Sequence, residues 1–172
     1  MTTQRLGQAL VEESAKKSGL LWVRGDGVPA RALWHVWHEG AVHVVGDGPG
    51  EQPLPGLADG GTAEVTVRSK DKGGRLVQWT ASVRRLEPGT PAWDAAVAEL
   101  RGKRLNATDA ESMAERWARE CRVLRLEPRG AAVTELSDGP LDAAPLPSPA
   151  VTRRPVPAAL PKLLLGRRGR RR

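Results

Sequence analysis

The segment Arg31-Ala-Leu-Trp-His-Val-Trp-His38 constrains the fold most, because it is apolar on both sides of an extended chain. Side chains alternate along a strand, so each face of this segment carries large residues. One face holds Ala32, Trp34 and Val36, and the other holds Leu33, His35 and Trp37. A strand with two apolar faces indicates a barrel, or a strand shared between a core and a partner subunit.

A hairpin is predicted at this segment, because only Glu39-Gly40 separates it from a second apolar run, Ala41-Val-His-Val-Val45. A two-residue turn fixes the register of the two strands. The register that follows pairs His38 with Ala41, Val36 with His43 and Trp34 with Val45.

The run after the hairpin is rich in glycine and proline: Gly46-Asp-Gly-Pro-Gly-Glu-Gln-Pro-Leu-Pro-Gly-Leu57. The backbone amides of such a loop can hold a phosphate group. The same composition is also typical of an irregular connection between two strands. Both interpretations are open at the level of composition.

Hydrophobic periodicity predicts helices and further strands around the hairpin. A first helix is expected at residues 4–17. A second is expected to begin at Pro91 with Thr90 as its cap, and a third at Thr108, where Thr108 and Glu111 have the spacing of a capping box. The expected strands are residues 20–24, 30–37, 41–45, 62–68, 75–86 and 121–126, with a further edge strand at 131–136. The order of one helix, five strands, two helices and a closing strand indicates an antiparallel Greek-key barrel.

The composition changes after residue 137, where seven of the fourteen prolines lie. Residues 151–172 hold eight Lys or Arg and no acid, so the first 150 residues carry 19 basic against 20 acidic groups. We therefore expect a folded domain at 1–136 and a disordered Pro-rich tail at 137–172. The tail offers electrostatic contact with nucleic acid or an anionic surface, or serves only solubility, through Arg167, Arg168, Arg170, Arg171 and Arg172.

Other features of the sequence exclude several classes of protein. No apolar run approaches the ~18–20 residues of a membrane span, and the N-terminus lacks the basic-then-apolar order of a signal peptide. The single Cys121 excludes an internal disulfide and a multi-cysteine metal site. His35, His38 and His43 fall on different faces or edges of the hairpin, so no metal site is predicted. A cytoplasmic location is expected.

Two stretches carry a resemblance to a known family. The run Leu21-Trp-Val-Arg-Gly-Asp-Gly-Val-Pro-Ala-Arg-Ala-Leu-Trp-His-Val-Trp37 resembles a strand, turn and strand that open the flavin-binding split-barrel superfamily. Thr80-Ala-Ser-Val-Arg-Arg-Leu-Glu87 is similar to that family's strand before its helices. The resemblance covers roughly residues 15–128, and the family is also called pyridoxamine 5′-phosphate oxidase-like.

The resemblance implies a mainly β fold with helices, a split β-barrel of antiparallel Greek-key strands that forms a homodimer. It also implies FMN or a deazaflavin in a groove at the subunit interface. The residues expected near that cofactor are Arg31, Trp34 and His35 on the strand, and Gly46, Glu51 and Gln52 on the loop. No residue is identified as a catalytic acid or base.

The glycine-rich loop departs from the family pattern. Members hold the cofactor phosphate with basic and hydroxyl side chains, whereas this chain has no Lys or Arg between Trp37 and Arg68. Asp47 and Glu51 would repel a phosphate dianion at close approach. Two functions follow: an FMN- or deazaflavin-dependent oxidoreductase, or a non-catalytic binding or scaffold dimer that has lost its cofactor site and uses a basic tail for tethering.

Overall fold

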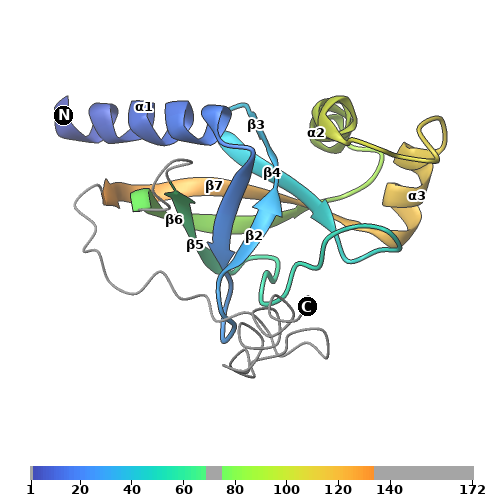
Figure 1. Cartoon of the computed structure of the whole chain (residues 1–172), viewed down its shortest axis with the longest axis horizontal. Coiled ribbons are helices and arrows are strands. Elements are labelled where there is room, and N and C mark those ends of the chain that lie inside the picture. The colour runs from blue at the N-terminus through green and yellow to red at the C-terminus, as the bar shows by residue number, and fades with distance from the viewer. Residues whose placement is uncertain (1, 69–74, 134–172) are drawn as a thin grey trace, which may run out of the picture.

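The computed structural model describes residues 2–68 and 75–133 (Figure 1). These residues contain three helices and seven strands, joined by turns and loops. In chain order they are α1 (Thr2–Lys17), β1 (Leu20–Arg24), β2 (Arg31–Trp34), β3 (Val36–His38), β4 (Ala41–Gly46), β5 (Thr62–Arg68), β6 (Arg75–Leu86), α2 (Pro91–Lys103), α3 (Met113–Glu120) and β7 (Arg122–Val133). The predicted mainly β fold with helices is confirmed. The predicted tail, 137–172, lies outside the described residues, as do residues 134–136 of the predicted edge strand.

The strands form one antiparallel sheet in the order β2-β1-β5-β6-β7-β4-β3. Its two edge strands, β2 and β3, are consecutive in the chain and are separated only by His35. The sheet therefore curls until its edges meet at one residue, which gives a nearly closed barrel. The sequence predicted a single strand here, because nothing in its pattern marks the break at His35.

The break corrects part of the predicted hairpin register. The pairs His38–Ala41 and Val36–His43 are confirmed. Trp34 pairs with Leu20 of β1 and not with Val45. The reason is geometric. To close the barrel, the predicted single strand must pair with β1 through its first part, β2, and with β4 through its second part, β3.

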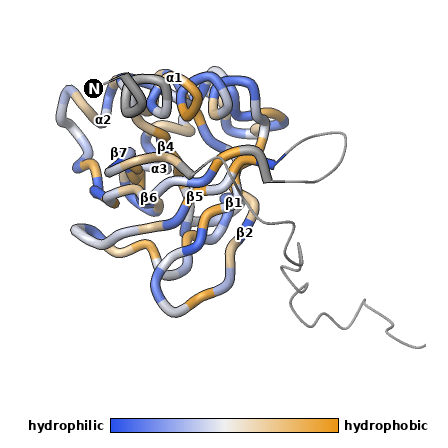
Figure 2. Tube along the Cα trace, turned by 90° about the vertical axis from the view of Figure 1, so that its left-hand side faces the viewer, coloured by the Kyte–Doolittle hydropathy of each residue, from blue (hydrophilic) through white to orange (hydrophobic). Residues whose placement is uncertain are grey.

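The barrel interior is lined by alternate apolar residues of the strands, as predicted for β5 and β6. Hydrophobic and hydrophilic residues alternate along the strands in Figure 2. Val11 and Ala15 of α1 belong to the same buried cluster, and so do Leu54 and Leu57 of the loop that follows β4. The loop is thus part of the core, and it cannot move without exposing apolar side chains to water.

A second apolar cluster lies outside the barrel, under α2 and α3. Val36, Val45 and Val123 come from the strands, and Trp93, Leu100 and Trp117 come from the helices. The helical residues follow the predicted spacing of i, i+3 and i+4. The segment from Arg31 to His38 therefore serves two cores, which explains its two apolar faces.

The two C-terminal helices begin differently. Thr90 caps α2, its hydroxyl accepting a hydrogen bond from the Trp93 amide, as the sequence predicted. The capping box predicted at Thr108 is wrong, because α3 begins at Met113 and Ser112 makes no side-chain cap. Asp109 instead binds the guanidinium of Arg116, which holds residues 108–112 in turns.

Among the described residues, no helix packs extensively against the outer face of β2, β1 and β5, which we call the open face. In Figure 1, α1 and α2 lie along the top of the view, and the turn between β1 and β2 points down, away from them. The extensive helix contacts among the described residues are with β3, β4, β6 and β7. Leu20 on the open face is 52% exposed, and Trp22 and Trp34 are half-buried. Within the described ranges no helix has the length and apolarity needed to span a bilayer.

Candidate functional site

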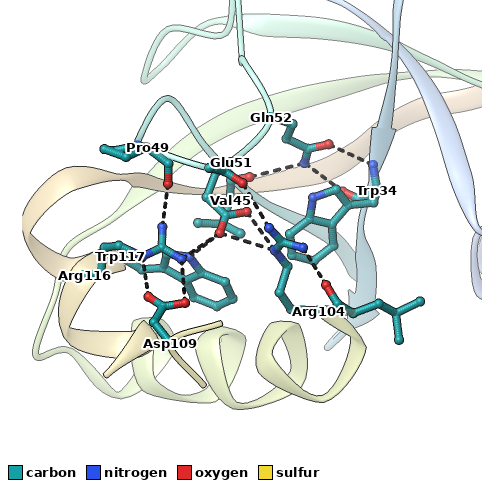
Figure 3. A network of polar contacts seen from close by, with 11 residues as sticks. Trp34, Val45, Pro49, Glu51, Gln52, Arg104, Asp109, Arg116 and Trp117 are labelled. Atoms are coloured by element: carbon teal, nitrogen blue, oxygen red, sulfur yellow. Dashed lines mark hydrogen bonds and ion pairs between the residues drawn. The ribbon is translucent and has the colours of Figure 1, made fainter. Parts of the chain in front are cut away.

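The loop from Asp47 to Leu57 is the candidate site, and Glu51 is its centre (Figure 3). The carboxylate side chain of Glu51 has no exposed surface. Burying a charge is costly unless it is paired and hydrogen-bonded. Glu51 meets this condition with donors from three residues, Arg104, Arg116 and Trp117.

The geometry of these donors is specific. Arg104 Nε lies 3.1 and 3.3 Å from the two carboxylate oxygens of Glu51. Arg116 Nη2 and Trp117 Nε1 each donate to Oε1 at 3.0 Å. Arg104 and Arg116 also donate to the carbonyls of Gly50 and Pro49. The tip of the loop is therefore tied to the turn after α2 and to α3.

Asp109 completes this group of charges. It accepts from Arg116 Nε at 2.6 Å and from Nη2 at 3.3 Å. These hydrogen bonds hold the pKa of Asp109 below its usual range and raise the pKa of Arg116. Arg116 is therefore fixed in position independently of Glu51.

A second acidic residue of the loop is also paired inside the molecule. Asp47 accepts hydrogen bonds from Arg122 of β7 and from the backbone amide of Leu54. Arg122 also donates to the carbonyls of Leu54 and Leu57. The cations that the loop lacks in sequence are thus supplied in space by residues 104, 116 and 122.

Gln52 ties the loop to the barrel. Its amide oxygen accepts from the Trp34 backbone N–H at 2.9 Å, and its amide nitrogen donates to the carbonyls of Trp34 and Val45 at 2.9 and 3.2 Å. These backbone groups lie next to the break at His35, where the regular strand ladder is interrupted. Gln52 therefore substitutes for the missing strand hydrogen bonds.

The other residues predicted near a cofactor have different surroundings. Gly46 is buried, and a Cβ atom there would lie 2.1 Å from the Gln52 carbonyl oxygen. His35 is buried, with Nε2 2.9 Å from the carbonyl of Ala15 in α1. Trp34 is half-buried between Trp117, whose ring centroid lies 6.4 Å away, and Arg104. Arg31 begins β2 and is half-buried.

A cleft of about 680 Å³ hollows the open sheet face near the turn between β1 and β2. Arg24 and Glu64 line it and pair across the strands at 2.8 Å, and the hydroxyl-bearing Thr62 and Thr80 lie beside them. Gly56, near the end of the candidate loop, and Ala58, just after it, form another part of the wall of the cleft. The loop thus runs from Trp34 to this cleft.

The histidines do not meet at one point. His38 and His43 lie with ring centroids 6.0 Å apart, while His35 belongs to the contact with α1. No group of three or more metal-ligating side chains that could hold a metal ion occurs within residues 2–68 and 75–133. His43 is 2% exposed and its Nδ1 lacks a hydrogen-bond partner.

The burial of His43 predicts an acid-sensitive fold. Desolvation, with Arg125 nearby, lowers the pKa of His43 from 6.5 to about 4. Below pH 6.5 the unfolded chain gains a proton that the folded chain excludes, so stability is lost as the pH falls towards 4. Between pH 7.5 and 5 this loss is on the order of 2 kcal/mol.

Urea denaturation of the wild type and of His43→Gln at pH 7.5 and at pH 5 measures this loss. The carboxylates titrate in both proteins, so their contributions cancel when the loss of unfolding free energy in the variant is subtracted from that in the wild type. The wild type is expected to lose more stability than the variant. An equal loss in the two proteins would contradict the assignment to His43.

The chain is similar to known proteins in structure but not in sequence. No protein-family model and no curated protein matches it. A provisionally named 5-nitroimidazole antibiotic resistance protein of Bacteroides thetaiotaomicron is similar in structure, with a TM-score of 0.51, 10% identity, and coverage of 77% of this chain and 83% of that one. The fold is a split barrel. The predicted fold class is therefore confirmed.

Two further solved structures are similar at lower TM-scores. The heme storage protein HutZ of Vibrio cholerae has a TM-score of 0.48 and 10% identity, with coverage of 72% of this chain and 91% of that one. The flavocytochrome Anf3 of Azotobacter vinelandii has a TM-score of 0.47 and 16% identity, with coverage of 90% of this chain and 84% of that one.

The geometry of the loop does not fit a cofactor phosphate as it stands. Asp47, Glu51 and Gln52 each use their polar atoms on partners within the chain. The positive charges of Arg104 and Arg116 are balanced by Glu51 and Asp109. A phosphate dianion at the loop would meet a neutral, fully bonded network.

Proposed function

We propose that the chain is a split-barrel protein that binds a flavin-type cofactor, FMN or a deazaflavin, at the interface of a homodimer and works as an oxidoreductase. The open, hollowed sheet face supports this proposal most strongly. It offers half-buried indoles and an adjacent cleft, both accessible from solvent. The reaction class follows from the cofactor, since flavins carry the hydride and the protein supplies the surface that orients them.

The apolar end of the open face suits an aromatic ring system. Trp22 and Trp34 lie on adjacent strands, where Trp22 pairs with Ala32 and Trp34 with Leu20. Large aromatic side chains stack with other aromatic rings at centroid distances of roughly 4.5–7 Å. Trp34 lies beside the candidate loop. A flavin ring bound against Trp34 would therefore direct its phosphate-bearing chain towards that loop. Arg31 begins the same strand, but it pairs with the inward residue Val23 and alternates with Trp34, so its side chain leaves the opposite side of the sheet from a ring bound at Trp34.

The open face also supports a homodimer, because exposed apolar surface of this kind is covered by partners in many proteins. The substitution Leu20→Glu is expected to raise the dissociation constant of the dimer at least tenfold, since a charge would be buried between subunits. Leu105→Glu is the matched control, because Leu105 is 75% exposed and lies in the turn between α2 and α3.

Sedimentation velocity over a range of concentrations measures both variants. A wild type that stays monomeric at high concentration, or two variants that weaken the dimer equally, would contradict the assignment of the open face.

The cofactor is tested by the absorption spectrum of freshly purified protein and by titration with FMN and a deazaflavin, followed through tryptophan fluorescence. The proposal expects saturable quenching by one of them, reduced in Trp34→Leu. Absence of a flavin band and of saturable quenching with both compounds would reject it in favour of a non-catalytic scaffold dimer.

A further inference from the structure

The donors around Glu51 form a site that would exist without it. Arg104 Nε, Arg116 Nη2 and Trp117 Nε1 converge on one carboxylate from α3 and from the turn that follows α2. Converging guanidinium and N–H donors are the arrangement by which proteins bind carboxylates and phosphates. Here the bound oxyanion is supplied by the protein's own loop.

The donors are held in place by groups other than Glu51. Asp109 binds Arg116 through two hydrogen bonds, and Arg104 Nη1 donates to the carbonyl of Leu105 at 2.7 Å. The Trp117 indole is fixed in the apolar cluster under the helices and has no exposed surface. The cradle is therefore organised before Glu51 enters it.

The charge of the cradle also favours an anion. With Glu51 in place, two guanidinium groups face the two carboxylates of Glu51 and Asp109. Without Glu51, the same two cations face Asp109 alone, which leaves one uncompensated positive charge. A partly buried positive charge attracts an anion more strongly than an exposed one does.

We propose that Arg104, Arg116 and Trp117 form an oxyanion cradle in which Glu51 acts as a self-ligand that competes with the phosphate group of the cofactor. The phosphate assignment rests on the proposed function, because it takes the anion to belong to a bound flavin nucleotide. The Glu51 side chain is then an autoinhibitory contact, because it keeps the cradle closed to phosphate in the wild type while the apolar part of the loop stays packed in the core.

The substitution Glu51→Ala tests the cradle in the full-length protein with acetate, inorganic phosphate and FMN. Acetate has the same heavy atoms that the substitution removes. Acetate and phosphate are each expected to raise the Tm of the variant by roughly 3 °C beyond NaCl of equal ionic strength, and not that of the wild type. Glu64→Ala is the matched control, since its partner Arg24 is a single exposed cation. No anion-specific shift in Glu51→Ala, or a shift with acetate alone, would overturn the proposal.

Glu51→Gln serves if Glu51→Ala does not fold, with the NMR signals of the Arg104 and Arg116 Nε–H groups as the readout. Phosphate is expected to move these signals in the variant but not in the wild type, and unmoved signals would overturn the proposal.

Binding of FMN to the wild type and to the Glu51 variants distinguishes failure of the cradle from failure of the proposed flavin binding. A phosphate effect without any binding of FMN would support the cradle as an anion site and reject the flavin proposal. FMN binding that is unchanged by both Glu51 variants would retain the flavin proposal and overturn the cradle.

Discussion

The substitution Glu51→Gln is expected to lower the free energy of unfolding by about 3 kcal/mol, the low end for breaking a buried ion pair by removal of one partner. The change keeps the size of the side chain and removes its charge. Arg104 and Arg116 then lose a shared counter-ion, while their side chains stay only 24% and 18% exposed. Some water reaches these arginines, which is why the low end applies.

Urea denaturation of the wild type, Glu51→Gln and Glu13→Gln measures this loss. Glu13 is exposed on α1 and pairs with Lys17 four residues on, so its substitution should leave the midpoint unchanged. Equal midpoints for all three proteins would show that the network in Figure 3 does not hold the loop.

The substitution Gly46→Ala is expected to cost about 3 kcal/mol, at the upper end for adding atoms to a packed site. The added Cβ would lie 2.1 Å from the Gln52 carbonyl oxygen and 2.7 Å from Leu54 Cγ. Backbone at position 52 cannot yield without breaking the hydrogen bonds of the Gln52 side chain. The cost therefore reports how tightly the loop is packed on the end of β4.

Gly102→Ala is the matched control for this prediction. Gly102 lies in α2, and a Cβ atom added there would meet no atom within 4 Å beyond its chain neighbours and the backbone of its own helix, so alanine should raise stability by up to about 1 kcal/mol. The measurement is the Tm of the wild type, Gly46→Ala and Gly102→Ala, obtained by thermal unfolding. A Gly46→Ala protein as stable as the wild type would contradict the close contact between Gly46 and Gln52.

The sequence predicted most of the fold, because its strands alternate cleanly and its turns are short. The inward residues of β5 and β6 and the Thr90 cap of α2 were all readable from local patterns. The break at His35 was not, since a barrel closure is decided by pairings with β1 and β4 that are distant in sequence. The start of α3 was misjudged because Asp109 binds Arg116 instead of supporting a cap.

The candidate site was predictable only in part. The loop and its unusual acids stood out in the sequence, and Asp47 and Glu51 indicated a poor phosphate site. The partners of these acids could not be found in the same way, because Arg104, Arg116 and Arg122 lie 53, 65 and 75 residues from them. An arginine in an amphipathic helix or strand gives no local sign that it pairs with a buried carboxylate.

The dissociation constants of FMN and riboflavin for the wild type test the central claim most directly, measured by equilibrium dialysis on the full chain. The two compounds differ only in the phosphate. An open face that binds the ring beside a loop closed by Glu51 predicts saturable binding of both, with constants within about threefold of each other, and FMN favoured about tenfold only in Glu51→Ala. No binding of either compound, or a strong preference of the wild type for FMN, would contradict the account.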